Sequence, residues 1–415
     1  MFRRRRVPTV LACALLAATL SPVGAGAHPR TSTESAAVLI QWNQIAQTTI
    51  YPPGGTTPIH AGQVQLGLVS MAMYDAVQGT RRSHGHSRSA SPSAAAAAAA
   101  HDVLAYYYPS SLPALDTALA GTLAGLPAGS SRDWGVAIGE DEAEDLLESR
   151  EDDGWGVALS FTRPPAIGVW RPTTAGALFS APWVGFLDLL VVDSTRRLDP
   201  GSPDRLTSAD YALDVAEVQL MGALNSTTRT TAETATALFY NFNVPIQMNS
   251  AMRGAATGST IFEAARLFGL TNTSAADAII TCWREKYDQP LWRPVTAIHE
   301  AADDGNPRTY PDPTWAPLVA SPPYPEWTSG HACLMGAYTR SLQLINRTDT
   351  VDLVLPSVVN GASVTRHYTS AEAIQQDAFN ARIWLGIHFR RSMEAGAYVG
   401  EKAATSVYDR FSPRW

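Results

Sequence analysis

Apolar residues recur every three or four positions along most of the chain, which is the pattern of amphipathic helices. In the first half this spacing predicts helices over residues 33–49, 62–77, 93–108, 115–126 and 131–150. In the second half it predicts helices over residues 208–224, 230–241, 246–268, 274–286 and 331–344, with a last pair from residue 370 onward. Residues 62–77 are apolar nearly all the way round, which is typical of a central, buried helix.

The helical pattern fails between residues 152 and 204, where proline, glycine and tryptophan interrupt it. We expect a long irregular segment there, joining two helical halves. Residues 351–365 are more β-prone, but strand alternation does not persist long enough to predict a sheet. The chain is therefore predicted to be all-α, with an N-terminal helical half at 28–205 packed on a C-terminal helical bundle at 206–415.

The N-terminus has the three parts of a secretory signal. Four arginines at residues 3–6 precede an apolar run at 10–20, and Ala25-Gly26-Ala27 forms an A-x-A cleavage sequence. The apolar run is shorter than the ~20 residues that a bilayer span needs, and no later stretch is long and apolar enough to replace it. We predict a signal peptide at 1–27, cleavage near Ala27 and a secreted, extracytoplasmic mature protein.

Charge and cysteine content narrow the function classes. A formal net charge of −7 argues against a general nucleic-acid partner. Lys286 and Lys402 are the only lysines, and Lys286 lies among other cations, where a compact point charge is useful; chance in an arginine-biased chain is the alternative. Cys282 and Cys333 lie near that cluster, and the sequence leaves open whether they form a disulfide or stay as thiols.

Three short segments in the last third of the chain combine cations, small donors and histidines. They are 286–293 (KYDQPLWR), 327–331 (WTSGH) and 382–388 (RIWLGIH). Lys286 and Arg293 would share one face of a continuous helix, although Pro290 predicts a bend or an end between them. On a continuous helix Arg382 and His388 would lie within about 120° of each other and could converge on one ligand.

Three unpaired cations are costly to bury, so these segments predict a multiply charged, tetrahedral or trigonal oxyanion. Ser329 and Gly330 add a hydroxyl and an unhindered backbone N–H, at the positive end of a helix if His331 begins one. His331 could move protons at the edge of the anion, and His388 could offer a neutral nitrogen to its central atom. A single helical histidine is more often structural than functional. The prediction of an oxyanion site therefore rests on the three segments occurring together and in order.

In that order, the segments resemble the vanadium-dependent haloperoxidases and the related type 2 phosphatidic acid phosphatase superfamily. The pattern of that superfamily is K-x6-R-P, then P-S-G-H, then S-R-x5-H-x3-D, and this chain carries most of it. The flanking sequences LWRPVTAI, SPPYPEWTSGHAC and RIWLGIHFR are also similar to bacterial members. The resemblance implies the helical bundle of the vanadium haloperoxidase and acid phosphatase type.

The resemblance also implies a role for each motif residue. His388 would be the apical ligand of vanadate, His331 the acid/base residue, and Lys286 a catalytic cation as well as an anion ligand. Trp283 and Tyr324 would flank the pocket. The oxygens of vanadate, or of phosphate in the same site, would be held by Lys286, Arg293, Ser329, Gly330 and Arg382.

The activity implied is that of a secreted haloperoxidase, oxidising a halide with hydrogen peroxide through a peroxovanadate bound at His388, for a small organic acceptor. One alternative is an acid phosphatase with His388 as nucleophile and His331 as acid/base. Another is a catalytically weak phosphate- or vanadate-binding protein. A homodimer is left open by the sequence.

Three residues depart from the superfamily pattern. Thr328 replaces the proline before Ser-Gly-His, Ala381 replaces the serine before Arg382, and Ser392 replaces the aspartate of H-x3-D. Ser392 matters most, because a carboxylate beside a ligating histidine orients its ring and raises its basicity. We therefore expect His388 to be more weakly oriented, to the disadvantage of a phosphohistidine mechanism above all.

Overall fold

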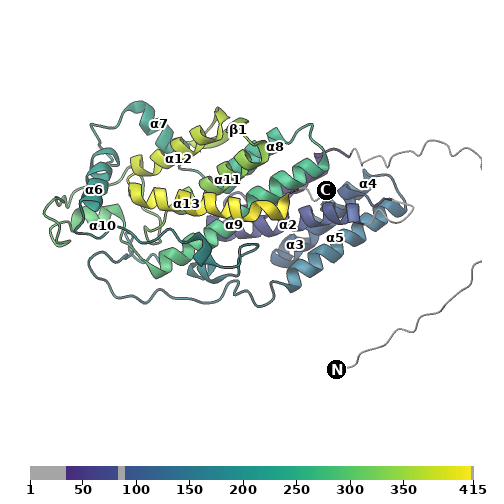
Figure 1. The fold of residues 1–415 in the computed structure, drawn as a ribbon, viewed down its shortest axis with the longest axis horizontal. Coiled ribbons are helices and arrows are strands. Elements are labelled where there is room, and N and C mark those ends of the chain that lie inside the picture. Colours follow the sequence, from purple (N-terminus) through teal and green to yellow (C-terminus); the bar gives the residue numbers. More distant parts are fainter. Residues whose placement is uncertain (1–33, 83–88, 413–415) are drawn as a thin grey trace, which may run out of the picture. The chain divides into compact units, whose positions relative to one another are not determined.

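The computed structural model describes residues 34–82 and 89–412, so the predicted signal peptide at 1–27 lies outside the described residues. The described chain is mostly helical, as predicted (Figure 1). Its first helices are α1 (Ala37–Ile50), α2 (Ile59–Arg82), α3 (Pro92–Tyr107), α4 (Leu112–Ala124) and α5 (Ser130–Glu148). The later ones are α6 (Ala209–Met221), α7 (Thr231–Phe239), α8 (Val244–Ala255), α9 (Ile261–Asp288), α10 (Pro294–His299), α11 (Gly330–Asn346), α12 (Ala371–Trp384) and α13 (Arg390–Val407).

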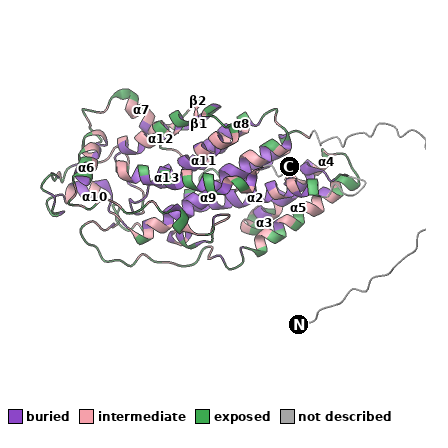
Figure 2. Cartoon of the chain, in the orientation of Figure 1, coloured by how far each residue is buried: buried purple, intermediate pink, exposed green. Residues whose placement is uncertain are grey.

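Helix α9 is the central element of the bundle. Helices α2, α11 and α13 all pack along it (Figure 1), and most side chains of its second half are buried (Figure 2). Helix α2 is buried on nearly every side, as its apolar pattern predicts. Within the described ranges, no helix combines the length and apolar content needed to cross a bilayer.

The predicted boundaries around α9 were wrong. Instead of one helix over 246–268, the chain ends α8 at Ala255 and starts α9 at Ile261, where Thr260 and Glu263 form a capping box. Instead of a new helix at 274, α9 runs unbroken for 28 residues. Its polar middle stays helical because those side chains have partners in the core: Asn272, for example, contacts Asn249 at 2.9 Å.

The irregular segment at 152–204 is confirmed, with two short 3-10 turns, η2 (Pro182–Phe186) and η3 (Thr195–Leu198). A buried carboxylate fastens it to α9: Asp277 accepts hydrogen bonds from the backbone N–H groups of Leu190, Val191 and Val192 at 2.6, 3.1 and 2.9 Å. Near the end of the same helix, Trp283 Nε1 donates to Ser180 O at 3.2 Å. The segment therefore covers the part of α9 that carries the motif residues.

The expectation of no sheet was wrong. Strands β1 (Thr350–Val359) and β2 (Ala362–Ser370) form an antiparallel hairpin around Asn360 and Gly361, whose φ angles are 51° and 81°. Alternate residues of β1 are buried, and the strand packs against α8. A two-stranded sheet needs such packing to be stable, and the sequence alone did not reveal that a helix covers this one.

Helices α11 and α13 approach each other closely. A Cβ added at Gly400 would lie 2.2 Å from the carbonyl oxygen of Cys333, and one added at Gly396 would lie 2.5 Å from that of Ser329. These two glycines therefore let the backbones touch, which no larger residue allows. The contact holds the start of α11, with the second motif segment, beside the middle of α13.

Candidate functional site

The three motif segments meet at one place. Lys286 lies in the last turn of α9, and Arg293 is the N-cap residue of α10. Ser329 is the N-cap residue of α11. Arg382 lies in the last turn of α12, and His388 lies in the loop before α13. We call the group formed by Lys286, Arg293, Ser329, Gly330, Arg382 and His388 the anion pocket.

Neither pair of motif residues shares a continuous helix. Helix α9 ends at Asp288, before Pro290, as that proline had suggested. Helix α12 ends at Trp384, and Gly386 has a φ of +79°, which a residue with a side chain rarely adopts. The helical spacing of Arg382 and His388 is therefore wrong as an explanation, since a turn, and not a shared helix face, brings His388 to the pocket.

Arg293 organises one wall of the pocket. It is fully buried; its Nε donates to Tyr324 O and its Nη1 to Ile387 O, both at 2.8 Å. Nη1 also lies 3.3 Å from His388 Nε2. Its Cζ lies 4.8 Å from the centroid of the Tyr324 ring, within the range of a cation–π contact. The guanidinium is thus fixed in place, with one nitrogen, Nη2, left over.

Lys286 has an unexpected set of partners. Its ammonium group donates to the carbonyl oxygens of Pro325 at 2.8 Å, Glu326 at 3.2 Å and Thr328. A lysine has three donors, so all are engaged with the segment that leads into α11. Burial, followed by the charge of Arg293, lowers the pKa of Lys286. An oxyanion can gain a hydrogen bond from Lys286 only by replacing one of these carbonyls.

Several polar atoms of the pocket have no partner. Among the described residues, Arg293 Nη2, Arg382 Nε and His331 Nε2 are buried without a hydrogen bond. Burial lowers the pKa of Arg382 to about 10. Unpaired buried donors of this kind are rare in folded proteins, and a dianion with several oxygens would satisfy them. The donor set therefore fits vanadate or phosphate.

The start of α11 adds neutral donors, as predicted. Ser329 Oγ accepts the N–H of Ala332 at 3.4 Å, which leaves its own proton available. Gly330 begins the helix, and the first N–H groups of a helix have no acceptor within it. A Cβ at Gly330 would lie 2.6 Å from the ring of Trp283. Only glycine fits there without moving that ring.

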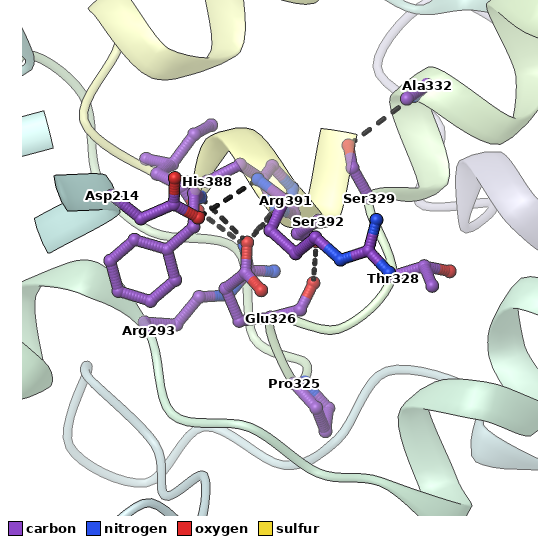
Figure 3. A network of polar contacts seen from close by, with 12 residues as sticks. Asp214, Arg293, Pro325, Glu326, Thr328, Ser329, Ala332, His388, Arg391 and Ser392 are labelled. Carbon is purple, nitrogen blue, oxygen red and sulfur yellow. Dashed lines mark hydrogen bonds and ion pairs between the residues drawn. The ribbon is translucent and has the colours of Figure 1, made fainter. Parts of the chain in front are cut away.

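His388 has a carboxylate partner after all. Glu326 Oε1 lies 2.8 Å from His388 Nδ1 and accepts the backbone N–H of Phe389 at 2.9 Å (Figure 3). We expected Ser392 to leave the His388 ring more weakly oriented, but Glu326 provides a carboxylate contact in place of the motif aspartate. Ser392 Oγ instead donates to the backbone oxygen of Glu326 at 3.2 Å. The sequence signal was only a glutamate five positions before His331, with nothing to tie it to His388.

Electrostatics set the state of His388. Burial lowers the pKa of His388, and the charges of Arg293, Lys286 and Arg382 lower it further, so the ring is neutral. Because Glu326 accepts a hydrogen bond from Nδ1–H, the remaining nitrogen, Nε2, carries a lone pair. A lone pair pointing among cations is what an apical ligand or a nucleophile requires.

The two flanking aromatic residues lie where the resemblance implies. The rings of Trp283 and Tyr324 are 5.0 Å apart, and Lys286 Nζ lies 5.0 Å from the centroid of Tyr324. A third ring, which was not predicted from the sequence, adjoins them: His60 of α2 stacks on Trp283 at 3.9 Å. Burial lowers the pKa of His60 to about 3, so it is neutral. His60 lies more than 200 positions before the first motif segment, and no recognised motif surrounds it in the sequence.

A cavity of about 460 Å³, which we call the side cavity, adjoins the pocket. Its walls are mostly apolar and aromatic, and it reaches Gly330, His331 and Arg382. Burial lowers the pKa of His331, with a further contribution from Arg382. His331 therefore lies between the pocket and the side cavity as a neutral imidazole.

The open question about the cysteines is answered by a disulfide between Cys282 and Cys333, whose Cα atoms are 6.8 Å apart. It joins α9 to α11 close to Lys286 and His331. Thr328 Oγ1 lies 3.1 Å from Cys282 Sγ, so the residue that replaces the motif proline packs against this bridge. The disulfide connects two of the helices that form the anion pocket.

Comparisons with known proteins cover the part of the chain that contains this site. Residues 266–415 match the VCPO second helical-bundle domain. The chain is 27% identical to vanadium chloroperoxidase of Curvularia inaequalis, over 44% of this chain and 40% of that protein, so the match spans about two-fifths of the relative's length.

Solved structures extend the likeness across the described chain. A bacterial vanadium-dependent iodoperoxidase matches with a TM-score of 0.75 at 21% identity, over 92% of this chain and 97% of that one. The holo form of a bacterial vanadium-dependent chloroperoxidase matches with a TM-score of 0.71 at 15% identity, over 92% and 98%. The chain thus has the vanadium haloperoxidase fold, and its residues 266–415 belong to the family of the VCPO second helical-bundle domain.

Proposed function

We propose that this protein is a vanadium-dependent haloperoxidase, which oxidises a halide with hydrogen peroxide and delivers the oxidised halogen to a small organic acceptor. The observation that carries the proposal is the neutral His388, held by Glu326 with its Nε2 facing buried cations, 3.3 Å from Arg293 Nη1. Vanadate bound there would supply a Lewis-acidic centre that activates the peroxide. The family relationship and the fold support the same activity.

The residues of the pocket divide the work. Arg293, Arg382, Ser329 and the Gly330 amide hold oxygens of the anion, and Lys286 keeps the segment before α11 in place. The halide loses two electrons while the O–O bond of the peroxide breaks. One oxygen leaves on the halogen as hypohalous acid, and the other leaves as water after taking up a proton. His331, neutral and without a partner on Nε2, moves that proton.

An acid phosphatase is the second candidate. Without a carboxylate on His388, a phosphohistidine mechanism would have been the weaker alternative, but Glu326 supplies that carboxylate. Nε2 of His388 would attack phosphorus, and His331 would protonate the leaving oxygen. Phosphate and vanadate have similar shape and charge, so the anion pocket itself does not favour one over the other.

A paired assay on metal-free protein distinguishes the candidates. We expect bromination of monochlorodimedone only when vanadate and peroxide are both added, and suppression of that reaction by inorganic phosphate. Aryl phosphate hydrolysis without bromination would instead establish the phosphatase. If neither reaction occurs, but phosphate at 100 times its Kd stabilises the fold by about 2.7 kcal/mol, the protein is an anion-binding protein. Sodium chloride at equal ionic strength controls for salt.

We place the organic acceptor in the side cavity. Its volume of about 460 Å³ exceeds the space that a halide or a peroxide needs and lies in the range of pockets for small organic ligands. Its apolar, aromatic walls favour an apolar acceptor, and neighbouring Arg382 disfavours a cationic one. The organic acceptor would thus bind beside His331, where the oxidised halogen is released.

Narrowing the side cavity is expected to slow halogenation of the organic acceptor without slowing oxidation of the halide. Ile59 lines the cavity and is 42% exposed, so Ile59→Trp adds bulk without disturbing the core. We expect halogenation of a bulky phenol to fall about tenfold, which corresponds to ~1.4 kcal/mol, while oxidation of iodide to triiodide stays unchanged. Leu213→Trp, at an exposed leucine outside the cavity lining, is the matched control. An equal fall in both reactions would exclude the cavity as the acceptor site.

A further inference from the structure

We propose that Glu326 is the positioning residue of His388, and that it replaces the aspartate missing at Ser392. The inference rests on the proposed function only in taking His388 as the residue that contacts the central atom of the anion. It concerns a residue outside the three motif spacings, brought to His388 by the fold across 62 positions of sequence.

The contacts of Glu326 are specific to the ring and its backbone. One carboxylate oxygen, Oε1, takes both the ring Nδ1–H of His388 and the N–H of Phe389, so ring and main chain are fixed together. Both side chains are almost fully buried, with exposed fractions of 0% for Glu326 and 1% for His388. A charge-assisted hydrogen bond in this buried environment strongly favours the Nδ1–H tautomer of His388. The lone pair of Nε2 is thereby directed away from Glu326.

The segment that carries Glu326 is itself held in place. Lys286 donates to the backbone carbonyl of Glu326, and Ser392 Oγ donates to the same oxygen. The motif position that usually holds a carboxylate thus supports the backbone of its replacement. Ser392 is 1% exposed, and an aspartate there would bring a second carboxylate next to the first. The two arrangements are therefore alternatives.

Two buried cations and the His388 ring face the Glu326 carboxylate. Burial raises the pKa of Glu326 to about 7, while Arg293 of α10 and Lys286 of α9 lower it. His388, on the loop before α13, is the third group that faces it. The two cations therefore favour the ionised carboxylate that accepts from Nδ1.

A second carboxylate offers a matched control. Asp214 of α6 accepts the backbone N–H of Arg391 at 2.9 Å (Figure 3), two residues after the N–H that Glu326 accepts. Both carboxylates thus cap the start of α13, but within the described part of the chain only that of Glu326 contacts the ring of His388. Asp214→Asn removes a capping charge and leaves the ring contact unchanged.

The test compares Glu326→Gln, Ser392→Asp, the double variant E326Q/S392D and Asp214→Asn in the full chain. Two readouts are used: the tautomer of His388 by ¹⁵N NMR of the ring, and the Kd of inorganic phosphate by calorimetry. We expect E326Q to mix the tautomers and to weaken phosphate binding 10- to 100-fold. The double variant is expected to recover most of the affinity, and Asp214→Asn to keep both properties.

Two outcomes would overturn the proposal. The first is a wild-type His388 tautomer and a wild-type phosphate Kd in E326Q. The second is an equal loss of phosphate affinity in E326Q and Asp214→Asn, which would mean that Glu326 acts only as a helix cap. If E326Q does not fold, Glu326→Asp and the double variant are used, and a double variant no better than S392D alone overturns it. Failure of halogenation with an intact NMR and phosphate response would count against the proposed function and not against this role of Glu326.

Discussion

Replacing His388 with alanine is expected to abolish halogenation and phosphate ester hydrolysis alike, with a fall in kcat of about 10³-fold or more. The reason is that Glu326, bound to the opposite ring nitrogen, directs the lone pair of His388 Nε2 into the anion pocket. Arg293 Nη1, 3.3 Å from that nitrogen, would also lose its neighbour. Steady-state kinetics with added vanadate, and separately with an aryl phosphate, measure the loss.

Two other histidine variants show whether this loss is specific. His331→Ala is expected to slow turnover while leaving the Kd of phosphate within a fewfold of wild type, because His331 moves protons and does not hold the anion. His367→Ala changes a histidine on the exposed hairpin, which pairs with Asp352, and is expected to change nothing. Retained bromination in His388→Ala would contradict the assignment of His388 as the anion's partner.

The sequence predicted the residues of the anion pocket better than it predicted how they reach it. The ordered motif named Lys286, Arg293, Ser329, Arg382 and His388, and the fold brings all five together. The helical geometry given for them was wrong, because Pro290 ends one helix and Gly386 turns the chain out of another. The residue types were enough to predict an anion pocket, whereas the positions of these residues depend on turns that the helical spacing does not reveal.

Glu326, His60 and the disulfide could not be predicted for a common reason. Each acts through a contact between segments far apart in sequence: Glu326 with His388, His60 with Trp283, and Cys282 with Cys333. Spacing within one helix reports on neighbours three or four positions away and carries no information about such pairs. Helical spacing also says nothing about the β1–β2 hairpin, because that hairpin packs against α8, which is distant in the sequence.

The partners of Lys286 lead to the second large effect that we expect. Lys286→Met keeps the apolar stem but leaves the buried carbonyls of Pro325, Glu326 and Thr328 without their donor. Hydrogen bonds to a charged group contribute about 1.5–3 kcal/mol each. Removing one of three neighbouring cations relieves some repulsion, so we expect a net loss of about 2–4 kcal/mol in the free energy of unfolding. Urea unfolding in phosphate-free buffer measures it.

The same variant distinguishes two roles for Lys286. If Lys286 serves only to bind the anion, Lys286→Met is as stable as wild type without phosphate and loses only the stabilisation that phosphate adds. If Lys286 braces the segment before α11, stability falls in both conditions, and phosphate affinity falls with it because Ser329 and Gly330 are displaced. Lys402→Met, at the exposed lysine of α13, is the control for loss of a lysine charge. We expect the second result, since all three donors of Lys286 already lie on the backbone that presents Glu326 to His388.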